Sequence, residues 1–550
     1  MRVLPGLTVR NAGREVLAGI TLLAIAVPLN IGYAQIAGLP ATAGLYSMIV
    51  PSIVYALVVS SRQLVAAPDA AAAALVASSI GGLAVAGSAD YLTLALAQAI
   101  VCGLVFVICS VFRLGFLANF LSKPILIGFV GGLALDILVS QIAKMLGVKI
   151  VSGGEFVQKS GDLVSGLSTA NAWSILVSVL SVLVLLLGRR VAPVVPWALI
   201  VLVAATLLVS VLNVQGAGVA MLGGVDAGPP KLGWPMLDWR TWLMLVPSAL
   251  ALTMVAMAEG LLVVRRYAEK NGYRTDPNRD LLALGLVNIV SGATGGFAVG
   301  SSTSRTAAMD QTGSRTQLPS IVAAVCTLLL VIFGTDLLAG IPSPAIGAIV
   351  AVAVVPLLGI ADFRSLWKLQ KFEFAVAVVC FLGAILVGPI AGIGVAFVLA
   401  LINLARRAAA PAIDVLGPDD SPGQSLLPAA PVITITAPGV IVFRFAAPLF
   451  FANAPVFADT IRKAVAAASS PAGENLHLVI DLEAVTDVDV TGAEAFTAIL
   501  SWLEQHNVAV SFSRLRPDLR RVMDHYGLLA DIVVFESNRA AVAALGRHQP

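Results

Sequence analysis

The sequence predicts a polytopic α-helical membrane protein of fourteen spans, arranged as two inverted seven-span repeats and followed by a soluble α/β domain. Hydrophobic residues make up 58% of the 550 residues and charged residues only 12%, whereas soluble domains carry about 25% charged residues. Long apolar stretches follow one another from Ala18 to Leu404, and the composition becomes that of a soluble protein from Pro411 onward. This division indicates a membrane body with a soluble tail.

The spans follow from the length of the apolar stretches. A hydrocarbon core about 30 Å thick needs roughly 20 apolar residues per helix. Residues 1–15 form a short basic amphipathic segment without a small-residue cleavage site, so the first span is expected to stay in place. The fourteen candidate spans are 16–37, 41–60, 64–83, 92–112, 117–141, 172–188, 194–213, 241–264, 280–298, 302–312, 318–337, 343–359, 372–388 and 389–405.

The distribution of lysine and arginine supports this count. With the N-terminus inside, eighteen of these residues fall in cytoplasmic loops and five, from Lys144 to Arg240, in outer loops. Such an excess of positive charge marks the cytoplasmic side, and missing one span would invert every later loop. Both termini are therefore expected in the cytoplasm.

The third and tenth spans are irregular. Residues 62–69 and 295–305 are each an extended segment, the first containing Pro68 and the second rich in glycine and serine, and each leads into a short helix. Broken helices are tolerated at membrane depth only where their backbone is buried or lines a cavity. Because the two interruptions occupy matching places in the two halves, they indicate inverted repeats with a substrate site between them.

The tail shows a different pattern. Residues 16–407 form the predicted membrane domain, 408–431 a linker rich in proline, glycine and alanine, and 432–550 the soluble domain. Strands are expected at 440–445, 476–482 and 508–512, and helices at 456–468, 491–506 and 518–525. Alternating strands and helices indicate a small α/β sheet domain.

The segment after the second interruption is the leading anion-binding candidate. Helix N-termini that face each other at mid-membrane bring unpaired N–H groups and partial positive charges to one point. Ser302, Thr303 and Ser304 add hydroxyl groups, and Arg305 adds a guanidinium. Arginine at this depth costs at least about 2.5–3.5 kcal/mol, which favours a functional role. The alternative is that Arg305 pairs permanently with Asp310 or Glu259 and only holds the helices together.

The first interruption and the first span supply further candidates. Ala67 and Pro68 precede the short helix of the third span, and Pro68 suits its first turn. Asp69 suits a helix N-terminus but would repel an anion there, so it either turns away as a cap or is protonated with the substrate. Tyr33 and Gln35 lie in a first span that is interrupted by proline and glycine, which indicates a cavity-lining helix or a kinked packing helix.

Two acids in apolar spans are candidates for ion coupling. Glu259 lies in the eighth span and Asp136 in the fifth, where Gly128, Gly131 and Gly132 predict close helix packing. Burial raises the pKa of a carboxyl group, so such a residue can exchange a proton near neutral pH. All four histidines lie in the tail and cannot carry protons within the membrane. A buried structural acid is the alternative for both residues.

Other kinds of chemistry have little support in the sequence. The four cysteines fall inside apolar stretches, where they are better interpreted as small apolar side chains than as disulfides or metal ligands. The chain has no catalytic triad, phosphate-binding loop or metal-ligand spacing. We therefore expect no enzymatic activity, no metal, no cofactor and no nucleic-acid partner.

The sequence resembles the SulP family of anion transporters, the bacterial relatives of solute carrier family 26, over nearly its whole length. The tail resembles a STAS domain, the module shared by sulfate transporters and anti-sigma-factor antagonists. The resemblance rests on Pro28, Tyr33-Ala, Ala37-Gly-Leu-Pro40, Gly44-Leu-Tyr46-Ser, Ser60-Ser-Arg62, Asn278-Arg-Asp-Leu, Gly285, Asn288, Gly292, Ser302-Thr-Ser-Arg305-Thr-Ala, Gly313-Ser-Arg-Thr-Gln317, Phe443–Asn453 and Asp487-Val-Asp-Val-Thr-Gly492.

The resemblance implies core and gate domains, anion binding between spans three and ten, a homodimer, and alternating access in a bacterial inner membrane. It places Ser304 and Arg305 at the anion position and Glu259 at the coupling-ion position. Bacterial relatives carry sulfate, bicarbonate or dicarboxylates such as fumarate and succinate. Ala43 and Asp69 depart from the usual family residues and leave the substrate open. Asp69 and Glu259 together favour proton symport, with sodium as the alternative.

In the tail, the resemblance aligns Thr491 with the phosphorylated residue of anti-sigma-factor antagonists. A phosphate at a helix N-terminus is well tolerated, and a cytoplasmic regulator would then bind the tail. An ordinary helix N-cap without phosphorylation is the alternative.

Three other functions remain open: a membrane-tethered STAS signalling protein, an uncoupled anion conductance, and a nucleobase permease. Midplane Arg305 and two broken helices argue against a simple anchor. Nucleobase permeases normally lack both the arginine and the STAS tail.

Overall fold

A computed structural model describes residues 4–116, 122–151, 154–192, 195–212, 214–225, 227–418, 429–432, 434–468 and 476–546. The start of the fifth predicted span and most of the second half of the predicted linker lie outside these residues. The chain divides into two compact units, residues 1–400 and 401–550. The long helix α19 (Pro389–Ala409) runs through the boundary.

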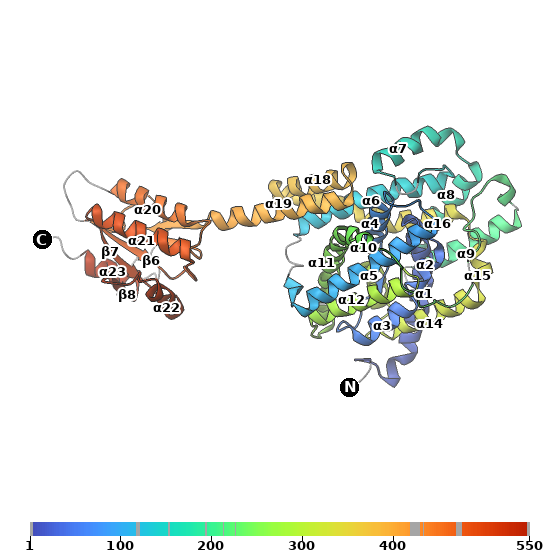
Figure 1. The fold of residues 1–550 in the computed structure, drawn as a ribbon, viewed down its shortest axis with the longest axis horizontal. Helices are drawn as coiled ribbons and strands as arrows, with labels where there is room; N and C mark the ends of the chain where they lie inside the picture. The colour runs from blue at the N-terminus through green and yellow to red at the C-terminus, as the bar shows by residue number, and fades with distance from the viewer. Residues whose placement is uncertain are drawn as a thin grey trace. The chain divides into compact units, whose positions relative to one another are not determined.

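The first unit is helical, and each of the fourteen predicted ranges contains a helix (Figure 1). Its first half consists of α1 (Val9–Ile36), α2 (Ala41–Tyr46), α3 (Val50–Val58), β1 (Ala66–Ala67), α4 (Ala70–Ile80), α5 (Ala89–Val111), α6 (Lys123–Leu146), α7 (Phe156–Ser165), α8 (Ala172–Val191) and α9 (Trp197–Val211). Its second half consists of α10 (Trp239–Met244), α11 (Val246–Asn271), α12 (Pro277–Ala293), β2 (Gly300–Ser301), α13 (Thr303–Gln311), α14 (Leu318–Phe333), α15 (Thr335–Ala339), α16 (Ser343–Val354), α17 (Ile360–Leu369) and α18 (Lys371–Leu386).

Several of these helical segments are long enough to cross a bilayer. Among the described residues six are long and apolar enough to do so, and there is a seventh if the pair 156–169 and 172–188, bent by 115°, forms one span. Helices α4, α9 and α14 are apolar but shorter. The six segments are Val9–Ile36, Ala41–Val58, Ala89–Val111, Lys123–Leu146, Trp239–Asn271 and Ser343–Leu369.

Glycines let the helices of this unit approach closely. An ideal Cβ at Gly128 of α6 would lie 2.1 Å from the Ala377 carbonyl oxygen of α18, and one at Gly132 would lie 2.8 Å from the Ala384 Cβ. An ideal Cβ at Gly131 would have its nearest neighbour at 3.2 Å, the Leu358 carbonyl oxygen. The predicted close packing of this helix is therefore confirmed. Backbone contact of this kind stabilises helix pairs in lipid, where apolar burial gives no driving force.

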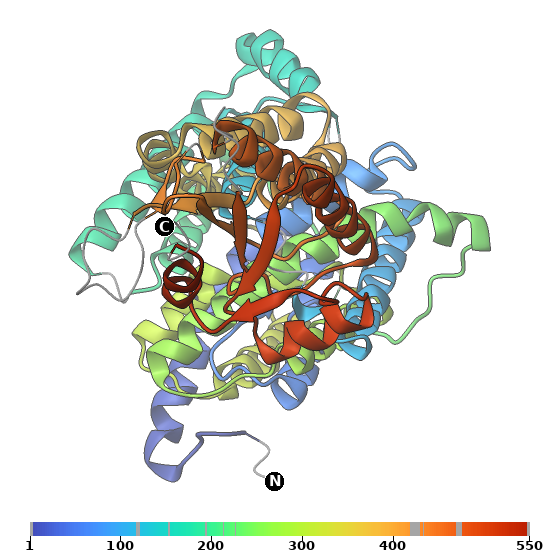
Figure 2. The same ribbon diagram turned by 90° about the vertical axis from the view of Figure 1, so that its left-hand side faces the viewer.

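The second unit is an α/β domain built on a six-stranded sheet (Figure 2). Its strands are β3 (Ala412–Leu416), β4 (Ala429–Ala430), β5 (Val440–Ala446), β6 (His477–Asp481), β7 (Ala509–Ser513) and β8 (Val533–Phe535), and its helices are α20 (Ala454–Ala468), α21 (Val490–Gln505), α22 (Pro517–His525) and α23 (Asn538–Leu545). The order is β4-β3-β5-β6-β7-β8. Strands β5 to β8 are parallel, and β3 is antiparallel to β5.

Both faces of this sheet are covered. Phe443, Phe457, Phe496 and Phe512 form the centre of the larger core, between the sheet and α20, α21 and α22. A smaller core on the other side includes Ala541 of α23. All predicted strands and helices of the tail are present. Ala412–Leu416 was expected in the linker, but this segment forms β3 and pairs with β5.

Candidate functional site

The two interruptions meet as a pair of short strands. Strand β1 pairs antiparallel with β2, so that Ala66 lies opposite Ser301 and Ala67 opposite Gly300. Two further hydrogen bonds join the segments: the Ser302 N–H donates to the Val65 carbonyl at 3.0 Å, and the Val65 N–H donates to Thr306 Oγ1 at 3.0 Å. Helices α4 and α13 begin within three residues of the strands. Their N-termini therefore meet at one point inside the unit.

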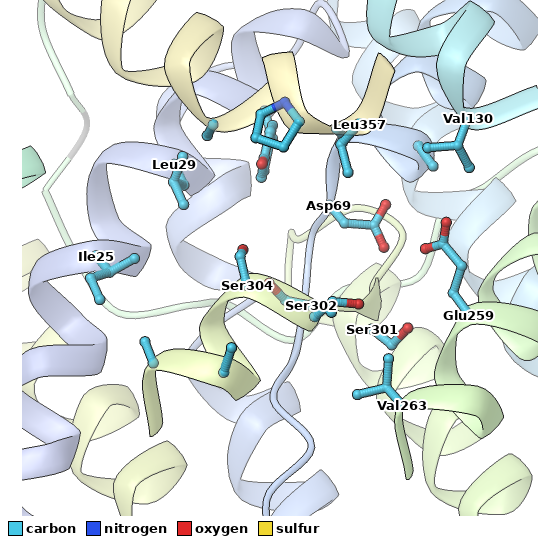
Figure 3. A pocket seen from close by; sticks show the side chains of 18 of the residues that line it. Ile25, Leu29, Asp69, Val130, Glu259, Val263, Ser301, Ser302, Ser304 and Leu357 are labelled. Carbon is cyan, nitrogen blue, oxygen red and sulfur yellow. The ribbon is translucent and has the colours of Figure 1, made fainter. Parts of the chain in front are cut away.

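A cavity of about 800 Å³ lies beside these helix ends (Figure 3). Its lining comes from α1, α4, α6, the start of α9, α11, the β2–α13 segment, α16 and α17. It follows α13 along its whole length, from Thr303 to Gln311, and it follows α1 from Tyr33 to Thr21. It is therefore a deep cleft with the helix N-termini near one end.

The α13 end of the cavity is lined by hydroxyl groups. Ser302 is the N-cap, and its hydroxyl accepts a hydrogen bond from the Arg305 N–H at 3.4 Å. Thr303 and Ser304, the first two residues of the helix, are exposed and line the cavity. The first N–H groups of a helix have no partner within that helix. The predicted Ser302, Thr303 and Ser304 are thus together at a helix N-terminus, where an anion is favourably placed.

Arg305 lies behind this end and does not line the cavity. Its side chain is 1% exposed. Nη1 donates to Asn30 Oδ1 at 2.7 Å, Nη2 donates to the Pro68 carbonyl, and Nε donates to Ser302 Oγ at 3.0 Å. The guanidinium carbon lies 5.8 Å from the centre of the Tyr33 ring. The guanidinium therefore joins α1, the β1–α4 segment and α13.

The alternative of a permanent ion pair for Arg305 does not match this geometry. Its hydrogen-bond partners are the neutral oxygens of Asn30, Pro68 and Ser302. Asp310 instead lies 2.5 Å from Lys270 and 3.4 Å from Arg315. The positive charge of Arg305 is therefore not cancelled by a bonded carboxylate, and its field acts on the neighbouring helix ends and the cavity.

Asp69 is the N-cap of α4. Its Oδ1 accepts a hydrogen bond from the Ala72 N–H at 2.7 Å, and the residue also lines the cavity. The carboxylate lies directly over Gly300, where an ideal Cβ would be 2.0 Å from Asp69 Oδ2. Only glycine leaves room for this arrangement. The expectation that Pro68 occupies the first turn of the helix was wrong, because Pro68 precedes the N-cap and α4 begins at Ala70.

Glu259 of α11 faces the same cavity. Figure 3 shows its carboxyl group beside that of Asp69, with Ser301 and Ser302 below them in this view. Among the described lining residues, the titratable side chains are Tyr33, Asp69, Glu259 and Asp362. The lining thus carries three carboxyl groups, and none of its described residues is a lysine, arginine or histidine.

Four other predicted residues do not line the cavity, and one of them is Pro68, whose carbonyl accepts a hydrogen bond from Arg305. Asp136 forms an ion pair with Lys159 of α7, with 2.8 Å between Nζ and Oδ2. Gln35 accepts a hydrogen bond from Lys144 of α6 at 3.0 Å. Ala67 is buried within β1. Of the predicted coupling residues, the structure therefore brings together only Asp69 and Glu259.

Asn30 and Asp362 were not predicted as site residues. Asn30 is fully buried and binds Arg305, and the signal that could have identified it is an amide in an apolar span. Asp362 lines the cavity from α17. It lies in a segment predicted as a charged cytoplasmic loop, where an acid carries no special signal.

Thr491 lies on the second unit, at the start of α21. It is exposed and is the second residue of the helix. The N-cap is Asp489, whose Oδ1 accepts a hydrogen bond from the Gly492 N–H at 2.6 Å. The alternative that Thr491 is itself the N-cap was therefore wrong.

Comparisons with known proteins agree with the architecture. A model of the sulfate permease family matches residues 13–380, and a STAS domain model matches residues 432–541. A protein described as a probable sulfate transporter of Mycobacterium tuberculosis is 34% identical over 529 residues, 94% of this chain and 92% of the relative. High affinity sulfate transporter 2 of Stylosanthes hamata is 26% identical over 562 residues, 97% and 84% of the two chains.

Solved structures show the same fold. Murine solute carrier 26 family member A9, an anion transporter in the inward-facing state, superimposes with a TM-score of 0.89 at 22% identity, covering 98% of this chain and 92% of that one. The transmembrane domain of a cyanobacterial bicarbonate transporter gives 0.61 at 20% identity, covering 73% and 99%. Because the sulfate permease family model matches most of the membrane unit and the STAS model matches the tail, this chain belongs to the SulP (sulfate permease) family of multi-pass membrane anion transporters.

Proposed function

We propose that this protein moves small oxyanions across the bacterial inner membrane by alternating access, with sulfate as the first candidate substrate. The observation that carries the proposal is the β1–β2 pairing, which brings the N-termini of α4 and α13 to one point beside the cavity. Sulfate leads because relatives that match nearly the whole chain are named as sulfate transporters. Bicarbonate and dicarboxylates such as fumarate and succinate are the alternatives.

The anion position is the N-terminus of α13. Thr303 and Ser304 offer hydroxyl and N–H groups to the cavity, and Ser302 and Tyr33 border them. Arg305 contributes its positive field from behind and holds the two interruptions together. A helix N-terminus carries roughly half a positive charge. Together these groups favour an anion without any metal.

Coupling to a cation follows from the carboxyl groups in the lining. Two unit charges about 4 Å apart interact by about 4 kcal/mol at an effective dielectric constant of about 20. A divalent anion beside Asp69 and Glu259 is therefore unfavourable unless carboxylates are neutralised. We assign this neutralisation chiefly to a proton on Glu259, with Na⁺ as the alternative cation. The proposed transport is therefore symport.

The proposed architecture is fourteen spans in two inverted seven-span repeats that form a core and a gate domain. It is supported by a helix in each predicted range, by the matching positions of the two interruptions, and by the excess of lysine and arginine in predicted inner loops. This topology places residues 16–407 in the membrane, and the linker 408–431 and the STAS domain 432–550 in the cytoplasm. Homodimerisation is part of the proposal.

In this topology the cavity extends toward the cytoplasm. Thr21, Gln311 and Asp362 line the end of the cavity away from the α13 N-terminus, and α1 begins on the cytoplasmic side. We therefore infer that the structure is an inward-facing state, in which an anion exchanges with the cell interior.

The test is uptake by proteoliposomes that contain the full chain. Labelled sulfate, bicarbonate, fumarate and uracil are each supplied with and without an inward proton gradient. We expect sulfate accumulation that the gradient increases, and loss of uptake in Ser304→Ala and Arg305→Ala. The matched control is Ser165→Ala on α7, a serine that does not line the cavity.

Each other outcome identifies a different function. Uracil uptake alone would favour a nucleobase permease, and sulfate flux that never exceeds its electrochemical equilibrium would favour an uncoupled conductance. Absence of flux for every solute would favour the tethered signalling protein. Unchanged sulfate transport in Arg305→Ala would contradict the role proposed for that residue.

A further inference from the structure

The amide groups at the end of α4 are already occupied by a carboxylate of the chain. Asp69 accepts a 2.7 Å hydrogen bond from the Ala72 N–H at the start of its own helix. The carboxylate lies against Gly300, so no side chain separates it from the strand. The N-terminus of α4 is therefore already bound to a negatively charged group that is covalently part of the chain.

This bound carboxylate and the proposed anion position share one cavity. Asp69 and Ser304 both line it, and Figure 3 shows Asp69 above Ser302 and Ser304 in this view. Ser301 also lines the cavity, is 2% exposed, and its hydroxyl has no hydrogen-bond partner in the part of the chain that the structure describes. A buried hydroxyl without a protein partner can bind a water molecule or a ligand in the cavity.

The charged groups around Asp69 do not neutralise it fully. Arg305 attracts Asp69 electrostatically, but its hydrogen bonds go to neutral oxygens, one of them the Pro68 carbonyl. Tyr33 faces the cavity from α1, Glu259 from α11 and Asp362 from α17, while α6 contributes only apolar lining residues. An ionised Asp69 and an oxyanion at the α13 end would therefore repel each other without a lysine, arginine or histidine side chain between them.

We propose that Asp69 is a tethered competitor of the substrate: its ionised carboxylate keeps an oxyanion out of the cavity, and a proton on Asp69 admits it. The proposal rests on the assignment of the anion position to α13. The proton comes from water in the cavity, adds to Oδ2, and returns to water when the anion leaves, while Oδ1 keeps its bond to the Ala72 N–H. A neutral carboxylic acid can also donate a hydrogen bond to the anion. Asp69 thus adds a proton requirement separate from Glu259.

The test measures the binding of labelled sulfate to the purified full chain from about pH 5 to about pH 8. Binding linked to one proton weakens by about tenfold per pH unit above the pKa of the group. We expect Asp69→Asn to bind sulfate at least about tenfold more tightly than the unmodified protein at the upper pH, with a pH slope reduced by one proton. Asparagine and aspartate cap helices about equally well, so the fold should persist.

Two further variants serve as a second test of the charge and as a control. Asp69→Ser also caps the helix without charge and is expected to behave like Asp69→Asn. Asp90→Asn is the matched control, because Asp90 is an exposed acid in the first turn of α5 and does not line the cavity; its sulfate affinity and slope should equal those of the unmodified protein.

The outcomes separate this inference from the proposed function. If the unmodified protein binds sulfate and both Asp69 variants keep its affinity and slope, the tethered-competitor role is wrong while sulfate transport stands. If neither the unmodified protein nor the variants bind sulfate at any pH, both conclusions fail. Binding by the variants alone at the upper pH supports the inference.

Discussion

The Arg305 guanidinium donates a 2.7 Å hydrogen bond to the side-chain oxygen of Asn30, and both residues are buried. This contact joins α13 to the C-terminal third of α1, two elements that both line the cavity. Because asparagine is neutral, it orients the guanidinium without cancelling its charge. An aspartate at this position would form an ion pair and weaken the field at the anion position.

Substitutions of Asn30 test this relationship. Asn30→Ala removes a hydrogen bond to a charged group, which contributes about 1.5–3 kcal/mol, so we expect a lower melting temperature and weaker sulfate transport. Asn30→Asp should keep the melting temperature but raise the KM for sulfate, because it pairs with Arg305. Thermal unfolding and proteoliposome kinetics measure the two effects. An unchanged KM in Asn30→Asp would show that the Arg305 field does not reach the anion.

Gly300→Ala tests the close approach between β2 and Asp69. The added Cβ would lie 2.0 Å from Asp69 Oδ2, so the carboxylate or the strand must move. Overpacking of this kind costs about 1–3 kcal/mol, and we expect transport to fall by about tenfold or more. Uptake of labelled sulfate at matched protein density measures the loss.

The matched control for Gly300 is Gly260→Ala on α11. A Cβ there would meet its nearest neighbours, on Leu284 and Ser301, at 3.5 Å, which is ordinary contact. We expect this variant to transport normally. Equal activity of the two variants would show that the position of Asp69 against Gly300 is unimportant.

The Asp136–Lys159 pair is expected to stabilise the fold and not to couple ions. Both side chains are largely buried, at 17% and 9% exposure. Removing one partner of a buried ion pair costs about 3–5 kcal/mol, whereas replacing both by apolar residues is often neutral. Asp136→Ala should therefore lower the melting temperature clearly, and Asp136→Leu combined with Lys159→Met should recover most of it.

The pH dependence of transport distinguishes a structural role of Asp136 from a role in ion coupling. We expect the double variant to keep the pH profile of sulfate uptake, since neither residue lines the cavity. Loss of proton-driven accumulation in a variant that melts normally would instead assign Asp136 to coupling.

Much of the fold could be predicted because its signals are local. The length of the apolar stretches predicted a helix for every range, and Pro68 and the glycines near 295 predicted the two interruptions. Strand β3 was missed because Ala412–Leu416 lies between proline-rich segments, and its pairing with β5 is a tertiary contact.

The site could be predicted only in part, because side-chain direction depends on distant segments. The hydroxyl groups of Ser302, Thr303 and Ser304 were identified from their place at a helix start. The direction of Arg305 depends on Asn30 and Pro68, more than 200 residues earlier in the chain. No local pattern indicates that its guanidinium points away from the cavity.

His477 gives the STAS domain a predictable response to acid. It is half-buried at the start of β6, with Nε2 2.8 Å from Ser511 Oγ. Burial lowers the pKa of His477 below its usual value of 6.5, because the charged imidazolium is disfavoured there. As the pH falls through the usual value, the unfolded chain takes up a proton before the folded domain does. The stability contribution is therefore present above this pH and is lost as the pH falls toward the folded pKa.

Hydrogen exchange of the full chain measures this effect. Peptides covering β6 and β7 should lose protection between about pH 7 and about pH 5, after correction for the intrinsic dependence of exchange on pH. His477→Gln, which cannot be protonated, should show a smaller loss over the same range. His506→Gln is the matched control, because His506 is exposed and lies beyond the end of α21, and its protection should follow that of the unmodified protein. Equal loss of protection in all three proteins would mean that the acid sensitivity of the sheet comes from another group.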